Sequence, residues 1–161
     1  MSEIMGTLFK YLMALLGIAV VAGILYMAMH KNKGTTEAGN VLQLSTNVTS
    51  TYSGQSAFTG LTTAVCAKLA PQGMSPDGAT LVNQWGGAVS CAVNANPAQF
   101  DVVENAVPSD GCVDLVTHLK SYVSVTLAGT TYDSSTPLDA GTATTQCHSA
   151  ATQAITLSFG K

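Results

Sequence analysis

The chain has four cysteines, which could bind a metal, act in a redox site or form disulfide bonds. Cys66, Cys91, Cys112 and Cys147 lie far apart in the sequence, and no two of them form the C-x-x-C pair of zinc sites and thioredoxin-like redox sites. An even number of cysteines in a small domain behind a hydrophobic N-terminal segment favours disulfide bonds made in an oxidising compartment. Three pairings are possible, and the alternative is four buried free thiols in a cytosolic protein.

Histidine and acidic side chains could also act in catalysis or bind a metal, but the chain lacks two common catalytic motifs. His30, His118 and His148 are part of no H-E-x-x-H helix, and no G-x-S-x-G motif is present. Asp110 and Asp114 lie four residues apart near the start of an expected helix, where negative charge favours the helix dipole. We predict a protein that is not an enzyme, with no catalytic residue, no metal site and no cofactor.

The chain has few charged residues, and they are unevenly distributed. Charged residues make up 9% of its 161 residues, against about a quarter in an average soluble domain. Residues 1–33 carry three lysines and one acid, whereas residues 34–161 carry three lysines and eight acids, and no arginine occurs. Nucleic-acid binding relies on basic patches and arginine forks, so we expect no nucleic-acid partner. The surface must instead be rich in Ser and Thr, which suits an extracellular protein packed against copies of itself.

An uncharged run at residues 11–29 is the most apolar part of the chain. As a helix it would be about 28 Å long, enough to span a bilayer, and it is longer than the apolar core of a signal peptide. We therefore expect it to be retained. More lysines follow the run than precede it, which would place the cysteines in the cytoplasm. The disulfide argument places them outside, and a basic leader removed from before Met1 would reconcile the two.

The expected helices follow from apolar spacing. One long helix should reach about residue 53, weakened or kinked near Gly34, with its second half presenting one apolar stripe to a domain. A short helix is expected over residues 61–69. Another should begin near Ser109 as its N-cap and continue to about residue 119.

Strand patterns dominate the rest of the chain. Short β-compatible runs occupy residues 86–94, 98–107, 122–127 and 153–160, and the Ser/Thr-rich stretch 129–146 is expected to be a long loop. The predicted fold class is α+β: a long N-terminal helix, apolar in its first half and amphipathic in its second, packed on an antiparallel sheet of about four strands.

Two regions are expected: an apolar helix for the membrane or a filament core at residues 1–33, and a globular head at residues 34–161 that includes the second half of the helix.

The order of several motifs in this layout resembles the type IVb pilins, particularly the bundle-forming pilin and the pilins of conjugative thin pili. The motifs are "TSTYSGQSAFTGLTT" after the helix, "WGGAV" at the first strand, "GCVDLV" at a helix start and "QCHSAATQAITLSFGK" at the end.

This resemblance implies specific disulfide pairs and a pathway of processing and assembly. In such pilins a prepilin peptidase removes a leader, and the apolar helix then forms the filament core. A cysteine near the end of the C-terminal loop bonds back to the helix that starts at "GCVDLV", which would pair Cys112 with Cys147. Cys66 would then pair with Cys91. The C-terminal loop would thus be closed by a disulfide.

One position departs from the family. Many type IV pilins carry Glu at mature position five, where it pairs with a neighbouring N-terminal amine, but this chain has Met5 there if Met1 is the mature N-terminus. Glu3 is the only carboxylate in the first 36 residues. We expect Glu3 to take over part of that role.

The resemblance implies the major subunit of a type IVb pilus, a homopolymer that is anchored in the inner membrane before assembly and extracellular afterwards. Its partners would be other copies, the prepilin peptidase and the pilus assembly machinery. Alternatives are a minor pilin or pseudopilin of a type II secretion or pilus system, or a single-pass anchored periplasmic or surface protein. The residues expected to act in assembly are Met1, Glu3, Lys10, Leu12, Leu15, Leu16, Ile18, Val20, Val21, Ile24 and Leu25.

Overall fold

The computed structural model describes the backbone of residues 2–161 and the side chains of residues 10–23 and 33–161. The chain divides into two compact units, Met1–Asn32 and Lys33–Lys161, and each is described here by itself. The first unit is helical throughout its described part. The second holds the remaining secondary structure, the core and all four cysteines.

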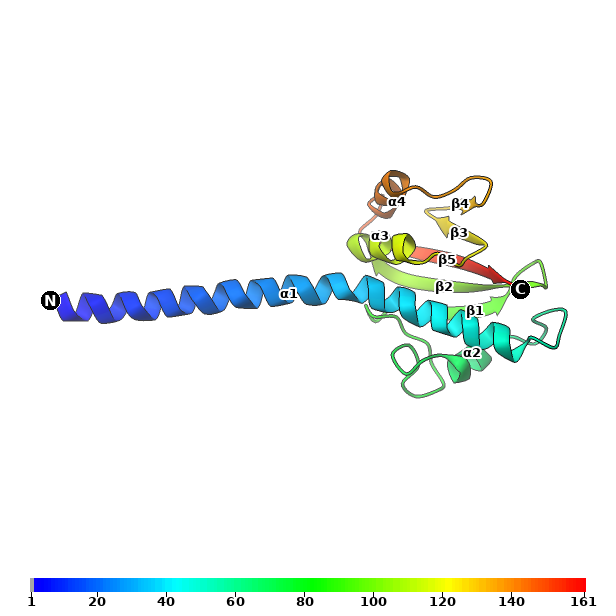
Figure 1. Cartoon of the computed structure of the whole chain (residues 1–161), viewed down its shortest axis with the longest axis horizontal. Helices are drawn as coiled ribbons and strands as arrows, with labels where there is room; N and C mark the ends of the chain where they lie inside the picture. The colour runs from blue at the N-terminus through cyan, green and yellow to red at the C-terminus, as the bar shows by residue number, and fades with distance from the viewer. Residues whose placement is uncertain (1) are drawn as a thin grey trace. The chain divides into compact units, whose positions relative to one another are not determined.

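The described residues form four helices and five strands (Figure 1). In chain order these are α1 (Ser2–Thr51), α2 (Thr63–Leu69), β1 (Val89–Val93), β2 (Gln99–Pro108), α3 (Ser109–His118), β3 (Ser124–Leu127), β4 (Thr130–Asp133), α4 (Ala140–Cys147) and β5 (Thr152–Gly160).

All five strands join one antiparallel sheet in the order β1-β2-β5-β3-β4. The C-terminal strand β5 lies in the middle, where Leu157 is paired with Val102 of β2 on one side and Val125 of β3 on the other. The predicted α+β class is confirmed. The sheet has one strand more than the expected four, because β4 forms within the stretch that was expected to be a loop.

The core of the second unit lies between the sheet and the helices. Val41, Leu44 and Val48 of α1 are fully buried at helical spacing, so the apolar stripe expected there faces the domain. On β5, Ile155 and Leu157 are buried at alternating positions. Within this unit, Figure 1 shows the second half of α1 alongside the sheet. Burial of each such aliphatic side chain stabilises the fold by about 1.5–3 kcal/mol.

The helix α1 continues through Gly34 without interruption, as the expected long helix requires. Glycine usually weakens a helix, but at this position it allows close packing against α3. A Cβ atom added to Gly34 would lie 2.3 Å from Cβ of Asp114. Gly34 is thus a contact point between two helices, which its local sequence alone does not reveal.

Two glycines of α1 provide a matched test of this contact. Gly34→Ala should lower the free energy of unfolding of the full chain in detergent micelles by about 1–3 kcal/mol, because the added methyl group overpacks the α1–α3 contact. Gly39 is exposed, and nothing lies within 4 Å of its added Cβ. Gly39→Ala should therefore raise that free energy by about 0.5–1 kcal/mol through helix propensity. Equal denaturant midpoints for the two variants would contradict the packing role of Gly34.

The Ser/Thr-rich segment before Cys147 is more regular than expected. Ala128 and Gly129 have φ of 48° and 81°, and they form a two-residue turn between Leu127 and Thr130, which pair across β3 and β4. Asp139 then caps α4, since its Oδ1 accepts hydrogen bonds from the backbone N–H groups of residues 141 and 142 at 2.8 and 3.0 Å. The pKa of Asp139 lies below its ordinary value, mainly because its carboxylate accepts a hydrogen bond from the Thr142 hydroxyl. The two backbone hydrogen bonds lower this pKa further.

The start of α3 also differs from the prediction. Ser109 is the first residue of the helix, and Pro108 occupies the N-cap position without a side-chain hydrogen bond. The ring of Trp85 covers this first turn, because a Cβ on Gly111 would lie 2.4 Å from the indole Cζ2. The first turn of α3 thus packs closely against the indole, which leaves no room for a side chain at Gly111.

Candidate functional site

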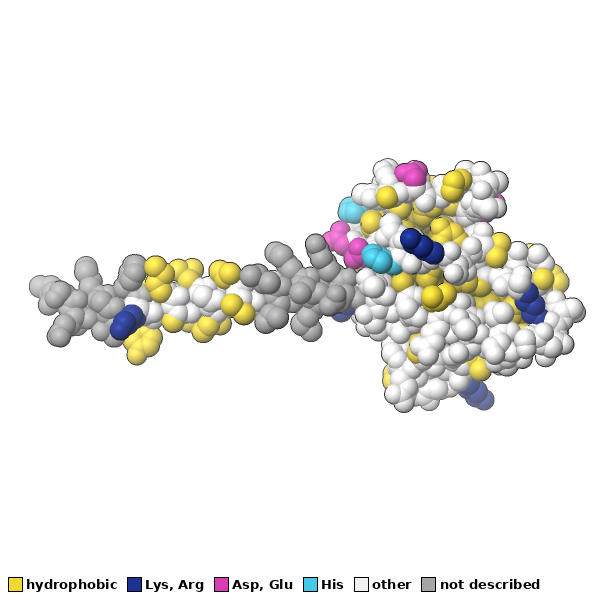
Figure 2. Space-filling view, viewed as in Figure 1, with side chains coloured by type: hydrophobic (Ala, Val, Ile, Leu, Met, Phe, Trp, Pro, Cys, Tyr) yellow, Lys and Arg dark blue, Asp and Glu magenta, His cyan; other side chains and the backbone are white. Residues whose placement is uncertain are grey.

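The helix carries apolar side chains around its whole circumference over residues 10–23, where the structure describes the side chains of the first unit. Of residues 10–23, the large apolar ones are between 53% and 69% exposed: Tyr11, Leu12, Met13, Leu15, Leu16, Ile18, Val20 and Val21. At 100° per residue these positions leave no polar face. Figure 2 shows them in yellow along the described part of this helix. A helix that is apolar all round is stable when lipid or other protein covers it, so this segment is the first candidate functional surface.

The structure describes most, but not all, of the residues expected to act in assembly. Lys10 is exposed at the beginning of the described side chains. Met1 and the side chains of Glu3, Ile24 and Leu25 lie outside the described residues. Over the described ranges, no helix has a stretch that is both long and apolar enough for a membrane crossing. The membrane span expected at residues 11–29 includes residues 24–29, whose side chains the structure does not describe.

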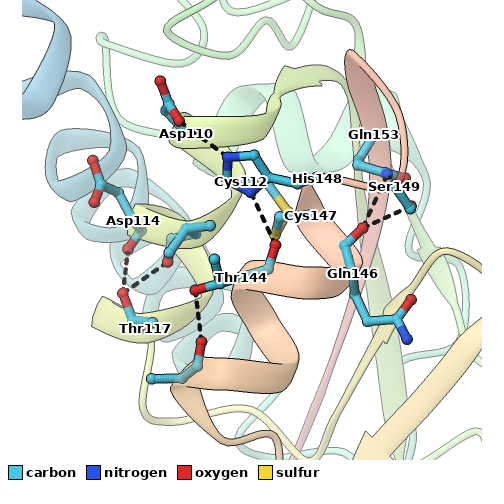
Figure 3. Close-up of a disulfide and its surroundings, with 12 residues drawn as sticks. Asp110, Cys112, Asp114, Thr117, Thr144, Gln146, Cys147, His148, Ser149 and Gln153 are labelled. Atoms are coloured by element: carbon cyan, nitrogen blue, oxygen red, sulfur yellow. Dashed lines mark hydrogen bonds and ion pairs between the residues drawn. A yellow bond between two sulfur atoms is a disulfide. The ribbon is translucent and has the colours of Figure 1, made fainter.

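One disulfide joins the two short helices α3 and α4 (Figure 3). Cys112 and Cys147 are buried, their Cα atoms are 5.6 Å apart, and they are separated by 35 positions in the chain. The bond therefore links the beginning of α3 to the end of α4, and it closes the segment that includes β3 and β4. That segment joins the sheet through the pairing of β3 with β5, and its buried side chains, such as Leu115 and Tyr132, pack in the core.

Polar contacts lie at the protein surface near this buried disulfide. His148 donates from Nδ1 to the carbonyl oxygen of Thr144 at 2.9 Å, and its Nε2 lies 3.5 Å from Oδ1 of Asp110 (Figure 3). His118 makes a similar 2.8 Å bond to the Asp114 carbonyl. Both histidines thus bind helix carbonyl groups one turn earlier. The described residues contain no group of three or more His, Cys, Asp or Glu side chains placed to hold a metal ion.

A second disulfide joins α2 to the edge strand β1. Cys66 and Cys91 are buried with their Cα atoms 6.2 Å apart, 25 positions apart in the chain. Thr63 reinforces this link, because its hydroxyl both donates to the carbonyl oxygen of Cys91 and accepts from its N–H, each at 3.1 Å. The α2–β1 junction thus has two independent attachments.

The end of α1 is attached to the end of β5. The ammonium group of Lys161 donates to the carbonyl oxygens of Tyr52 and Gln55, just beyond the last helical residue, and lies 5.1 Å from the centre of the Phe58 ring. A cation at a helix C-terminus is favoured by the helix dipole, and an ammonium group over an aromatic ring is attractive. This contact fixes the direction in which the chain leaves the helix.

A shallow groove runs between the second half of α1 and the end of β5. Its lining is uncharged and rich in hydroxyl groups: Leu42, Ser45, Thr46, Thr49, Ser50, Ser53, Ser121, Phe159 and Gly160. Leu42 is one of the few large apolar side chains exposed on the second unit. This face matches the neutral, hydroxyl-rich surface expected from composition.

Two glutamates lie in the core, and sequence reasoning missed both. Glu37 of α1 and Glu104 of β2 are both 0% exposed. Glu37 Oε2 accepts hydrogen bonds from the Gln84 N–H at 3.1 Å and from Asn40 Nδ2 at 3.4 Å. The signal was present in the spacing, because Glu37 precedes Val41 by one turn and Glu104 continues the inward alternation of Phe100 and Val102.

Burial shifts the titration of both carboxyl groups. The pKa of Glu37 is raised, mainly because burial disfavours its charged form, and the hydrogen bonds from Asn40 and Gln84 oppose that rise. The pKa of Glu104 lies well above its ordinary value, first through burial and then through the nearby charge of Glu37. Glu37 is therefore the better placed of the two to ionise.

Comparisons with known proteins agree with this architecture. The family model described as PilS N terminal matches residues 31–159. The solved structure of TcpA, a type IV pilin from Vibrio cholerae El Tor biotype, matches with a TM-score of 0.57 at 15% sequence identity, covering 79% of this chain and 98% of TcpA. No curated protein sequence matches the chain. At this identity the match to TcpA supports the fold, and the match to the family model covers most of the chain.

Proposed function

The chain belongs to the PilS N-terminal family, a family of type IVb pilins that are structural subunits rather than enzymes, and from this premise we propose that it is the major subunit of a type IVb pilus. It would polymerise through its hydrophobic N-terminal helix into an extracellular filament. The single observation that carries this proposal is the apolar circumference of residues 10–23.

The physical reason is the amount of apolar surface that this helix exposes. Eight large apolar side chains are open over residues 10–23, and each is worth about 1.5–3 kcal/mol when fully buried. Packing with the same segment of other copies would cover every side of the helix. Ala19 and Gly23 are four residues apart and small, so neighbouring helices could approach closely there.

Before assembly the same surface would be covered by lipid. We propose that the chain is anchored in the inner membrane by this helix, is processed by a prepilin peptidase and is extracted by the pilus assembly machinery. Two buried disulfides in the second unit suit a head that lies in an oxidising compartment. An uncharged, hydroxyl-lined face on that unit suits close packing between heads.

Glu3 is proposed to take over part of the role of the acid that many type IV pilins carry at position five. An uncompensated charge in an apolar filament core is costly, so the N-terminal amine of a neighbouring copy needs a carboxylate partner. Glu3→Ala should reduce the amount of pilus recovered from cells by about tenfold or more, while Glu3→Asp should retain a large part of it. Immunoblots of sheared and cell-bound fractions measure this effect. Parental assembly by Glu3→Ala would contradict the pairing.

The proposal as a whole is tested on filaments sheared from cells. Electron microscopy should show pili that disappear when this chain is deleted and return when it is restored. Mass spectrometry of the sheared fraction should identify this chain as the most abundant protein. Trace amounts in a filament made of another subunit would assign it as a minor pilin instead.

A further inference from the structure

We propose that Glu37 and Glu104 share one proton and form a pH-sensitive clasp that holds α1 against β2, strong in acid and weakened as the surroundings become alkaline. The inference concerns the head alone and does not depend on the proposed function. It begins with the position of the two carboxyl groups, which are fully buried. Both glutamates lie beside the segment 83–84, because the Gln84 N–H donates to Glu37 Oε2 at 3.1 Å and Asn83 Nδ2 donates at 2.8 Å to the carbonyl oxygen of Asn105, the residue after Glu104.

The carboxyl groups lack the partners that two full charges would need. Within the described part of the chain, Oε1 of Glu37 and both carboxyl oxygens of Glu104 are buried without a hydrogen-bond partner. A buried, unpaired carboxylate is strongly unfavourable, and two such charges side by side are worse. One proton held between the groups removes one charge and gives the remaining carboxylate a donor.

The surroundings favour ionisation of one member of the pair. Glu37 receives the backbone N–H of Gln84 and the side chain of Asn40, which stabilise a negative charge. Asn83 also favours the charged form of Glu104, but less than burial and the charge of Glu37 oppose it. Glu37 is thus the carboxylate of the pair, and Glu104 is the carboxylic acid.

Among the described side chains, no ion pair offsets a second charge. In the structurally described ranges, neither glutamate forms an ion pair with a lysine or histidine. On α1 itself, Lys33 lies one turn before Glu37 but forms no ion pair with it. On α3, the nearby charged residue is Asp114, whose side chain contacts Gly34 and is itself an acid.

On the sheet, the described residues around the pair bring no opposite charge. The strands β1 and β5 place Val89 and Ile155 beside Glu104. On β2, the carboxylate of Asp101 is occupied with Asn94 and Ser158. Ionisation of Glu104 would therefore add a second negative charge with no counter-ion among the side chains that the structure describes.

The sign of the pH effect follows from proton linkage. In the unfolded chain both glutamates titrate near their ordinary pKa of 4.5, whereas in the folded chain their pKa values are raised. Stability from the pair is complete below that value and is lost as pH rises, until the folded chain also releases its proton. Acids with lowered pKa values, including Asp77 at about 2, lose their contribution only below this window.

A shared proton predicts a definite slope. While the folded chain keeps one proton that the unfolded chain has released, the unfolding constant should rise about tenfold per pH unit. Two retained protons would give about a hundredfold, and none would give no dependence on this pair. The difference in slope between the parent and Glu104→Gln isolates the pair from the histidines, which both proteins share.

The experiment uses the full chain in detergent micelles. Guanidinium unfolding is followed by the fluorescence of Trp85, the only tryptophan, which adjoins the Gln84 N–H bonded to Glu37. From about pH 5 to about pH 8, we expect the parent slope to exceed that of Glu104→Gln by about tenfold per pH unit. The matched control Asp77→Asn removes an exposed acid whose pKa, about 2, lies below this window, and it should keep the parent slope. Equal slopes in parent and Glu104→Gln, or a hundredfold difference, would overturn the shared proton.

A second measurement needs no variant that might fail to fold. The chain has three glutamates, Glu3, Glu37 and Glu104, so carbon-13 labelling of glutamate gives three carboxyl signals. Near neutral pH, we expect one signal at the protonated position and two at the ionised position. Three ionised signals, or two protonated ones, would overturn the proposal.

Discussion

A chain without residues 1–30 is expected to be water-soluble, monomeric and unable to form filaments. The deletion removes the segment whose described part exposes large apolar side chains on every side, and it leaves the buried core of the second unit intact. Without that segment, the attraction between copies loses most of the apolar area that could be buried. Sedimentation of the secreted head and electron microscopy measure the outcome. Filaments made by the truncated chain would contradict the assembly role of the helix.

A substitution in the full chain tests the same role without a deletion. Val20→Asp should reduce sheared pili by about a hundredfold, because a charge in a helix surrounded by apolar material costs about 2.5–3.5 kcal/mol. Val20→Ile, at the same exposed position, should assemble normally. Membrane fractions must contain equal amounts of both variants, so that a failure to insert is separated from a failure to polymerise. Normal pili from Val20→Asp would argue against an apolar filament core.

The second large effect is expected at the disulfide between α3 and α4. Replacing both Cys112 and Cys147 by Ser should abolish pili and lower the free energy of unfolding by about 3–4 kcal/mol. That is a large share of the 5–15 kcal/mol or so of a typical domain. The matched control replaces Cys66 and Cys91, and it should weaken pili rather than abolish them.

The two bonds differ in their surroundings more than in loop length. Separations of 35 and 25 positions give nearly equal chain-entropy effects, since these vary only with the logarithm of length. The α2–β1 junction keeps the two hydrogen bonds between Thr63 and Cys91 when its disulfide is removed. Beside Cys147, the exposed pair of His148 and Asp110 is a weak substitute.

Peptide mapping under non-reducing conditions checks the chemistry on which this comparison depends. We expect peptides that link Cys66 to Cys91 and Cys112 to Cys147. A peptide linking Cys66 to Cys112 or Cys91 to Cys147, or four free thiols, would contradict both the pairing and the oxidising location. Equal loss of pili in the two double variants would contradict the added support from Thr63.

The sequence predicted those elements whose apolar spacing is strong. Val41, Leu44 and Val48 gave a helical stripe, and Ile155 and Leu157 gave an alternating strand, and all five are buried. Patterns of this kind survive folding because they are set by which side of an element faces the core.

The sequence did not predict β4 and α4, because their Ser/Thr-rich composition lacks that apolar pattern. Local signals were nevertheless present. The Ala128–Gly129 turn and the capping Asp139 mark where each element begins. Turn and cap residues are thus more informative than hydrophobicity in this part of the chain.

Contacts between distant segments were beyond the reach of sequence patterns. Gly34 was taken as a weak point of the helix, although it is the place where α3 approaches. Glu37 and Glu104 occupy inward positions of their elements, so each could have been marked as unusual. Their meeting depends on how α1 lies on the sheet, which neither local pattern contains.

The most direct test of the account is a helical reconstruction, by electron cryo-microscopy, of filaments sheared from cells that make this chain. We expect residues 10–23 of neighbouring copies to contact one another along the filament axis, with the disulfide-bonded heads outside. A filament in which this segment contacts no other copy, or a pilus built without this chain, would contradict the assembly mechanism proposed here.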